Sequence, residues 1–390
     1  MISKKTLNFR VGLFTTSRMV VNTASRMIYP FLAVFAAGLN VEIAVISMAM
    51  AVSMATSAVG PFIAPIADRR GRRTGMLIGM AIFLAGVFSV SLFPSVTTFF
   101  IAIILVNLGN NIFLPALQAY IGDHTPYAKR GAYLAVTELS WALSFIMLVP
   151  LAGFMLENST WNMPFIGLSV LGTLMTALIW ILVPKDAPVE MEPLTILSDI
   201  KKVLVYMPAV MGMLMGAALI TGNELVNVVF GVWMQDSFGL QIAALGAASV
   251  IIGISELGGE GIAALIADRL GKERSIAFSL LANGLWVVTL PWLGKSLPGA
   301  FAWLFVFYLT FEVAIVCSLP LMTEVMPKAR ATMMALFIAA LSLGRALGDV
   351  VAPHLYAGGF FLNAVACLAL DLMAIFFLTR IKLPARQTSD

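Results

Sequence analysis

Charged and amide side chains interrupt the longest apolar stretches of this 390-residue chain. Arg18, Asn22 and Arg26 follow one another at intervals of four, which places all three on one face of a helix. A guanidinium group held among apolar residues can bind an anion, and a carboxyl group in the same surroundings can take up and release a proton. These residue types therefore indicate binding of a small charged molecule, proton transfer, or both.

Four glutamates lie in comparable apolar stretches, where a charged side chain costs about 2.5–3.5 kcal/mol and is a functional candidate by default. The candidates for proton coupling are Glu138, Glu224, Glu256 and Glu312. Depth along each helix, at about 1.5 Å per residue, pairs Arg18 with Glu138 and Arg345 with Glu312. Each pair has an alternative, structural role, the neutralisation of a buried charge. We interpret Arg345 and Asp349, at i and i+4, as a structural pair.

Further amide and aromatic residues accompany these charges and complete the set of binding candidates. The candidates for substrate binding are Arg18, Asn22, Arg26, Tyr29, Asn107, Asn111, Asn223, Glu224, Asn227, Trp233 and Arg345. No nucleophile–base arrangement, phosphate loop or cluster with the spacing of metal ligands accompanies them. We therefore expect neither an enzyme nor a bound metal or cofactor.

The composition defines the solvent of this chain. Apolar residues make up 60% of it and charged residues 11%, against roughly 25% charged residues in ordinary soluble domains. A membrane-spanning helix needs about 20 mostly apolar residues. Twelve segments meet this requirement: 10–38, 43–67, 73–93, 97–120, 131–156, 161–183, 207–235, 241–267, 274–293, 298–325, 330–357 and 359–381. We predict an all-α membrane protein with twelve transmembrane helices, surrounded by a lipid bilayer.

The basic residues set the orientation of these segments. Lysines and arginines gather in the loops on one side of the predicted spans, and only Lys295 falls in a loop on the other side. Basic loops mark the cytoplasmic face. We expect a multi-pass protein of a bacterial or archaeal cytoplasmic membrane with both termini in the cytoplasm. The formal net charge of +4 comes from these short loops, so we expect no nucleic-acid partner.

The chain carries an internal duplication. Residues 67–73, Ala-Asp-Arg-Arg-Gly-Arg-Arg, return as residues 267–274, Ala-Asp-Arg-Leu-Gly-Lys-Glu-Arg. The acid, proline and arginine of residues 123–130 also recur in order at residues 324–330. Six helices return the chain to its starting side, so the two repeats are parallel, an arrangement that places a binding site between them near the bilayer midplane.

A polar, proline-containing interval separates the two repeats. It runs from Pro184 to Pro208, and part of it has the pattern of an amphipathic surface helix. We predict an N-terminal six-helix bundle over 1–184, a cytoplasmic linker over 185–206 and a C-terminal six-helix bundle over 207–390.

The loop between the second and third segments resembles a known signature. The Major Facilitator Superfamily carries G-x-x-x-D-R-x-G-R-R/K there, and residues 64–73 read Ala-Pro-Ile-Ala-Asp-Arg-Arg-Gly-Arg-Arg. Ala64 replaces the leading glycine. The resemblance covers essentially the whole chain and implies two pseudo-symmetric six-helix bundles that transport a small molecule by alternating access. It also implies that the first, fourth, seventh and tenth helices line the central cavity. We expect a monomer.

The same resemblance implies a cytoplasmic gate. Asp68 would contact the start of the eleventh helix near Arg330, and Arg72 would pair with Asp123. The candidate gating residues are Asp68, Arg69, Arg72, Asp123, Arg130, Asp268 and Arg269. The alternative is that the arginines only enforce topology.

Two transport hypotheses remain open. Residues 149–153 keep the proline and one glycine of the helix-5 signature of drug/proton antiporters, although the arginine of their helix-4 signature is absent. This resemblance favours proton-coupled efflux of small amphipathic compounds by antiport. The alternative is a carrier of a specific anionic metabolite, nutrient or lipid-like solute, bound by Arg18, Arg26 and Arg345. A membrane sensor or scaffold is a third possibility, which no attached soluble domain supports.

Overall fold

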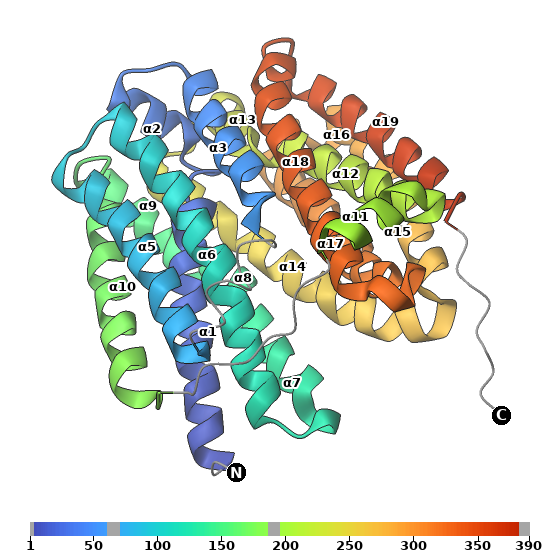
Figure 1. Ribbon diagram of the computed structural model, residues 1–390. Coiled ribbons are helices and arrows are strands. Elements are labelled where there is room, and N and C mark those ends of the chain that lie inside the picture. The colour runs from blue at the N-terminus through green and yellow to red at the C-terminus, as the bar shows by residue number, and fades with distance from the viewer. Residues whose placement is uncertain (1–3, 61–70, 186–195, 382–390) are drawn as a thin grey trace. The chain divides into compact units, whose positions relative to one another are not determined.

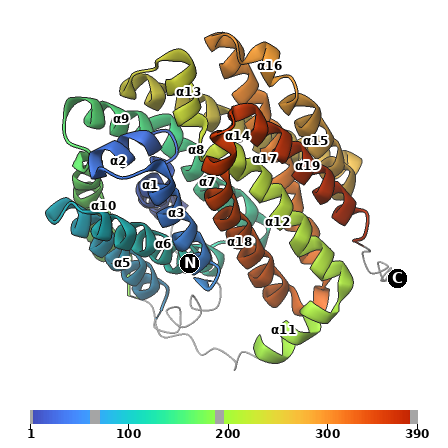
Figure 2. The ribbon, with the colours of Figure 1, turned by 90° about the horizontal axis from the view of Figure 1, so that it is seen from above.

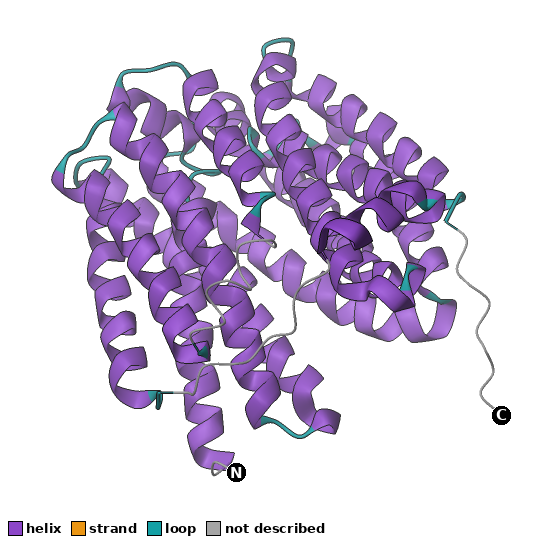
Figure 3. Ribbon diagram, in the orientation of Figure 1, coloured by secondary structure: helices purple, strands orange, loops and turns teal. Residues whose placement is uncertain are grey.

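The computed structural model describes residues 4–60, 71–185 and 196–381. Within these ranges the regular secondary structure is helical throughout, with no strand (Figure 3). The chain divides into two compact units. The first comprises Met1–Glu192 and Val228–Ile254, and the second comprises Pro193–Asn227 and Ser255–Asp390.

The first unit holds the helices of the first repeat and a segment of the second (Figure 1). In chain order they are α1 (Lys4–Arg26), α2 (Leu32–Leu39), α3 (Ile43–Ser57), α5 (Arg72–Leu92), α6 (Val96–His124), α7 (Tyr127–Glu138), α8 (Ser140–Leu143), a π-helical turn (Ser144–Leu148), α9 (Val149–Asn158), α10 (Met163–Leu182), α13 (Phe230–Phe238) and the first part of α14 (Ile242–Leu270).

The second unit holds the remaining helices. They are α11 (Ile196–Val205), α12 (Met207–Asn227), the rest of α14, α15 (Lys272–Val287), α16 (Leu290–Leu293), α17 (Leu297–Val325), a 3₁₀ turn (Pro327–Ala329), α18 (Arg330–Tyr356) and α19 (Phe360–Leu378). Within this unit α12 packs against α18 and α19 (Figure 2).

Each of the twelve predicted segments contains a helix or a run of helices in its described part. By length and composition alone, nine helices among the described residues could cross a membrane, and the pair α2 and α3, bent by 110°, could add a tenth. The polar face of α1 lowers its mean hydropathy, and α15 spans only 16 residues. These two helices occupy the predicted first and ninth segments.

Five of the twelve predicted segments are interrupted within their described residues. The second is interrupted at Ala58 and Val59, and the ninth at Val288 and Thr289. The first is interrupted at Met27–Phe31, where Pro30 lacks an amide donor. The seventh is interrupted at Val228 and Val229, a β-branched pair with lower helix propensity. The fifth breaks after Glu138 and then passes through the π-helical turn at Ser144–Leu148, a feature frequent at functional sites.

Glycines bring helices of the first unit into backbone contact. Figures 1 and 2 show α5 and α6 running side by side, and Gly79 and Gly109 face each other at their interface. A Cβ atom on Gly109 would lie 2.6 Å from the carbonyl oxygen of Gly79. Small residues of this kind let membrane helices pack closely.

Similar contacts attach Val228–Ile254 to the first unit. Gly231 packs directly on the backbone of Pro30, and a Cβ atom on Gly246 would lie 3.1 Å from the Cα atom of Pro150. A Cβ atom on Gly253 would lie 2.8 Å from the carbonyl oxygen of Ala142. The division at 1–184, 185–206 and 207–390 describes the sequence repeats and remains a prediction.

A pair of alanine substitutions in α6 tests the glycine packing. Gly109→Ala places a methyl group against the rigid backbone at Gly79, and overpacking of this kind destabilises a protein by about 1–3 kcal/mol. Gly122→Ala is the matched control, because its Cβ atom would meet no described atom within 4 Å. We expect a lower thermal unfolding midpoint in detergent for Gly109→Ala only. Equal midpoints for the two variants would contradict the close approach.

Candidate functional site

The predicted pair of Arg18 and Glu138 is confirmed. The Arg18 guanidinium, only 3% exposed, lies 2.8 Å from a carboxylate oxygen of Glu138 and donates to the carbonyl oxygen of Thr137 at 3.1 Å. Helix α7 ends at Glu138, and the last carbonyl groups of a helix lack intrahelical partners. The break in the fifth segment therefore creates the acceptor that Arg18 uses.

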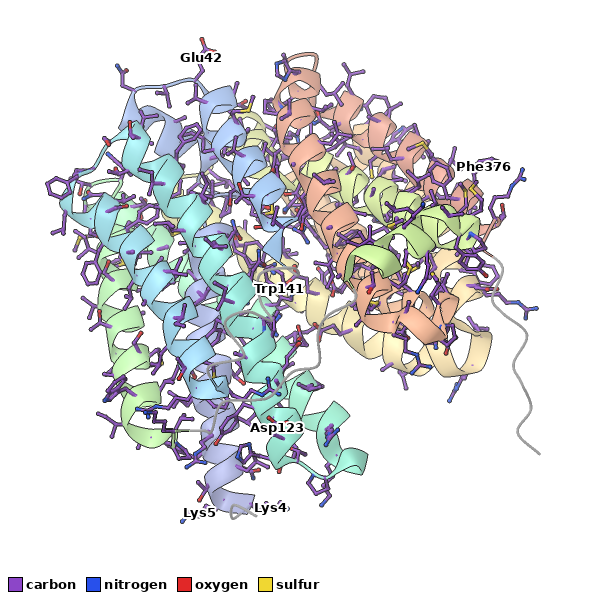
Figure 4. All side chains as sticks on the ribbon, viewed as in Figure 1. Lys4, Lys5, Glu42, Asp123, Trp141 and Phe376 are labelled. Carbon is purple, nitrogen blue, oxygen red and sulfur yellow. The ribbon has the colours of Figure 1, made fainter. Side chains whose placement is uncertain are left out.

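Arg26 lies against two aromatic rings. Its guanidinium carbon is 3.8 Å from the ring centre of Phe145 and 4.6 Å from that of Trp141, and the residue is 7% exposed. A cation over an aromatic face gains about 0.5–2 kcal/mol, more when desolvated. Phe145 belongs to the π-helical turn. Figure 4 shows Trp141 between the two ends of the first unit.

The polar face of α1 therefore packs on the irregular fifth segment. Asn22 completes this face, because its amide nitrogen lies 3.3 Å from the Ser140 hydroxyl. The sequence predicted that Arg18, Asn22 and Arg26 share one face, but not the aromatic surface that covers Arg26. The spacing of Trp141 and Phe145, at i and i+4, was the signal that could have indicated it.

Two amides of α6 bond to neighbouring helices. The Asn107 amide nitrogen is 2.5 Å from the Ser53 hydroxyl on α3, and its oxygen accepts from Ser25 of α1 at 3.4 Å. The Asn111 amide nitrogen donates to the carbonyl oxygen of Ser57 at 3.3 Å. These bonds hold the first, second and fourth segments together, and a role of the two asparagines in substrate binding stays a prediction.

The remaining candidates of the first unit are buried. Tyr29 lies in the break between α1 and α2, and Trp233 packs edge-on against Phe238 with ring centres 5.9 Å apart.

The second unit brings a glutamate and an arginine together across α12 and α18. Glu224 is fully buried, and one of its carboxylate oxygens lies 3.6 Å from the Arg345 guanidinium. The other oxygen accepts a hydrogen bond from the Asn227 amide at 3.4 Å, and Tyr308 of α17 donates to the Asn227 oxygen at 2.9 Å. Asn223 is also buried. Glu224, Asn227 and Arg345 thus form one cluster with Tyr308.

Close packing of α12 on α18 makes this cluster possible. A Cβ atom on Gly344 would lie 2.7 Å from the carbonyl oxygen of Ala217, and one on Gly348 would lie 3.0 Å from the Cγ atom of Glu224. The Thr221 hydroxyl donates to the Gly344 carbonyl oxygen at 2.9 Å. The Gly344-x-x-x-Gly348 spacing is a known helix-contact pattern and was the signal that sequence reasoning missed.

The other two candidate carboxylates lie elsewhere in the second unit. Depth alone paired Arg345 with Glu312, whereas the contact described above joins Arg345 to Glu224. Glu312 is half-buried on α17 and packs against Gly259 of α14. Glu256 is half-buried on α14. Their role in proton coupling stays a prediction.

The loop charges form matching pairs in the two repeats. The predicted pair is confirmed, because the Arg72 Nε atom lies 2.9 Å from Asp123. Lys272 pairs with Glu324 at the corresponding place in the second unit. Each basic residue follows a glycine with positive φ, Gly71 at 99° or Gly271 at 82°, a conformation that glycine adopts readily.

The remaining gating candidates are less fully described. Asp68 and Arg69 lie outside the described residues, as does the side chain of Asp268. Arg130 donates to the Thr125 carbonyl oxygen at 3.2 Å, and Arg269 is exposed. Figure 4 shows Asp123 at the same end of the first unit as Lys4 and Lys5.

The helical bundles, buried charges and repeated loop pairs define a polytopic membrane protein built for transport. The model of the Major Facilitator Superfamily matches residues 14–348 and residues 212–390. The chain belongs to this superfamily and is a membrane transporter rather than an enzyme.

Known relatives agree with this assignment. The uncharacterized MFS-type transporter YceJ of Bacillus subtilis is 25% identical over 353 residues, covering 89% of each chain. The multidrug transporter MdfA of Yersinia pestis is 28% identical over 199 residues, covering 46% of this chain and 48% of its own length. The inward-facing, unoccupied structure of a bacterial homologue of the human lysosomal transporter Spinster aligns with a TM-score of 0.76 at 14% identity, covering 97% of this chain and 98% of the other.

A double-mutant cycle tests the ion pair of the first unit. Glu138→Gln leaves the buried Arg18 without its carboxylate partner, and Arg18→Gln removes the cation. We expect the double variant to be less destabilised than the sum of the singles, with a coupling free energy of about 0.5–3 kcal/mol from unfolding midpoints in detergent. Glu157→Gln, an exposed glutamate in α9, serves as the control and should leave the midpoint unchanged. Additive effects of Arg18→Gln and Glu138→Gln would mean that the two charges do not interact.

Proposed function

We propose that this transporter exports small amphipathic compounds in exchange for protons by alternating access. The observation that carries the proposal is the Glu224 carboxyl group, which is fully buried yet has its guanidinium partner at 3.6 Å, beyond hydrogen-bonding distance. A buried carboxylate needs close compensation to stay charged. A loosely compensated one can gain or lose a proton when the surrounding helices move.

The contacts of the arginines support this hypothesis over the anion carrier. Arg18 is engaged by Glu138 and Thr137, and Arg26 is covered by Trp141 and Phe145. Both of these buried cations are thus already held by groups of the chain itself. We assign Arg18 and Arg26 to positioning the fifth segment beside the transport path.

The relative named as a multidrug transporter supports export. We propose that protons are the coupling ion, with Glu224 the principal carrier and Glu138, Glu256 and Glu312 as further candidates. We also propose that both termini lie in the cytoplasm, on the side of the basic loops, and that Arg72 and Asp123 belong to the gate on that side.

Proteoliposomes with an internal pH dye test the proposal. A lipophilic cation such as tetraphenylphosphonium, added under an imposed pH gradient, should trigger proton release through the wild-type protein. Glu224→Gln should abolish this response, because the amide cannot carry a proton. The exposed Glu157→Gln should retain it.

An opposite pattern would favour the anion carrier. A response to organic anions alone, lost in Arg26→Ala and kept in Glu224→Gln, would contradict proton-coupled export. It would mean that the buried arginines bind the substrate.

A further inference from the structure

A second carboxyl group lies beside Glu224. Asp349 is on α18, one turn after Arg345, and is fully buried. Among the described residues, no backbone amide, hydroxyl, amide or cationic side chain donates a hydrogen bond to either of its oxygens. Its chain neighbour Gly348 lies against the Glu224 side chain, so the Asp349 and Glu224 carboxyls belong to the same buried site on α12 and α18. The Arg345 guanidinium lies 3.6 Å from Glu224 and also interacts electrostatically with Asp349. Two buried carboxyl groups thus share one guanidinium.

Other titratable groups on the helices packed around this pair contact other parts of the unit or are exposed. On α17, Tyr308 donates to Asn227. Also on α17, Glu312 packs against Gly259 and Glu324 pairs with Lys272. On α19, the Cys367 thiol lies 3.9 Å from Asp371 and 3.8 Å from Asn283. On α11, Lys201 and Lys202 are exposed, as is His354 farther along α18. Arg345, 3.6 Å from Glu224, is the basic group that interacts electrostatically with both carboxyls.

Electrostatic repulsion determines the protonation state of two such neighbouring carboxyl groups. Two carboxylates in one desolvated site cannot both stay ionised, because their repulsion is not screened by water. A hydrogen bond between two carboxyl groups requires a proton on one of them. With one proton, the pair carries a single negative charge, which the single positive charge of Arg345 balances.

We infer that Glu224 and Asp349 form one proton-binding site that holds a single shared proton, with Arg345 balancing the remaining charge. We further assign this shared proton as the one exchanged for substrate, a step that rests on the proposed function. Asp349 is then a second proton-binding residue and not only the structural partner of Arg345.

The packing of the two helices links this proton to helix movement. Gly348 brings the α18 backbone against the Glu224 side chain, so the separation of the carboxyls follows the separation of α12 and α18. Helix α12 ends at Asn227, and the break at Val228–Val229 follows directly. Displacement of the end of α12 from α18 removes the repulsion between the carboxyls and allows the shared proton to leave.

Infrared titration of the transporter in lipid vesicles tests the shared site. The carbonyl stretch of a protonated carboxyl reports the proton directly, without any transport. Glu224→Gln and Asp349→Asn should each abolish the same titrating band, because the remaining carboxylate then pairs with Arg345 and stays ionised. The double variant should remove no further band. Asp371→Asn, which neutralises another buried acid of this unit, should leave the band in place.

Transport by the same preparations tests the exchanged proton. Substrate-driven proton release should be lost in both Glu224→Gln and Asp349→Asn and kept in Asp371→Asn. If the Asp349→Asn variant kept the carbonyl band of the wild-type protein, with the same pH dependence, the inference would be overturned. If Asp349→Asn does not fold, Glu224→Gln carries the test by itself, since a separate Asp349 band surviving in it would overturn the shared site.

The two proposals fail in different ways. A wild-type protein with the shared band, but with no proton release on addition of any substrate, would contradict proton-coupled export and support the shared site. Proton release that survives in Asp349→Asn would support proton-coupled export and contradict the assignment of its proton to this pair.

Discussion

Every charge buried among these apolar helices must be compensated by a neighbouring helix, and the functional architecture depends on this constraint. In the first unit, Glu138 and the Thr137 carbonyl compensate Arg18, while two aromatic rings cover Arg26. In the second unit, Arg345 faces Glu224. An uncompensated ion would be expelled or neutralised, since the hydrocarbon interior provides no water to solvate it.

Irregular backbone and glycine contacts supply the geometry for this compensation. The end of α7 leaves a carbonyl oxygen for Arg18, and the π-helical turn holds Phe145 against Arg26. Gly348 in turn admits the Glu224 side chain to the surface of α18. These features weaken local helix regularity, and each coincides with a buried charge. These departures from ideal helix geometry therefore lie where charged side chains are buried in the membrane interior.

An ion pair at the start of a helix occurs at corresponding places in the two repeats, although different residues form it. Arg72 with Asp123 and Lys272 with Glu324 are both ion pairs between the start of one long helix and the end of the following long helix. Gly71 and Gly271, each with a positive φ, immediately precede Arg72 and Lys272. Charge sign and backbone turn were retained where the residue types changed. By contrast, the buried charges differ between the units, which gives each unit its own chemistry.

The sequence by itself determined the class of protein, the twelve helical segments and two of the ion pairs. Arg18 with Glu138 follows from depth along two helices, and Arg72 with Asp123 from the superfamily signature, so neither required a packed structure. The tertiary structure alone decided that Arg345 faces Glu224 and that aromatic rings cover Arg26. Depth sets the level of a residue in the membrane, but its lateral neighbour depends on helix rotation and close approach. Contacts such as Gly344 against Ala217 set that rotation, and they exist only once the helices have packed.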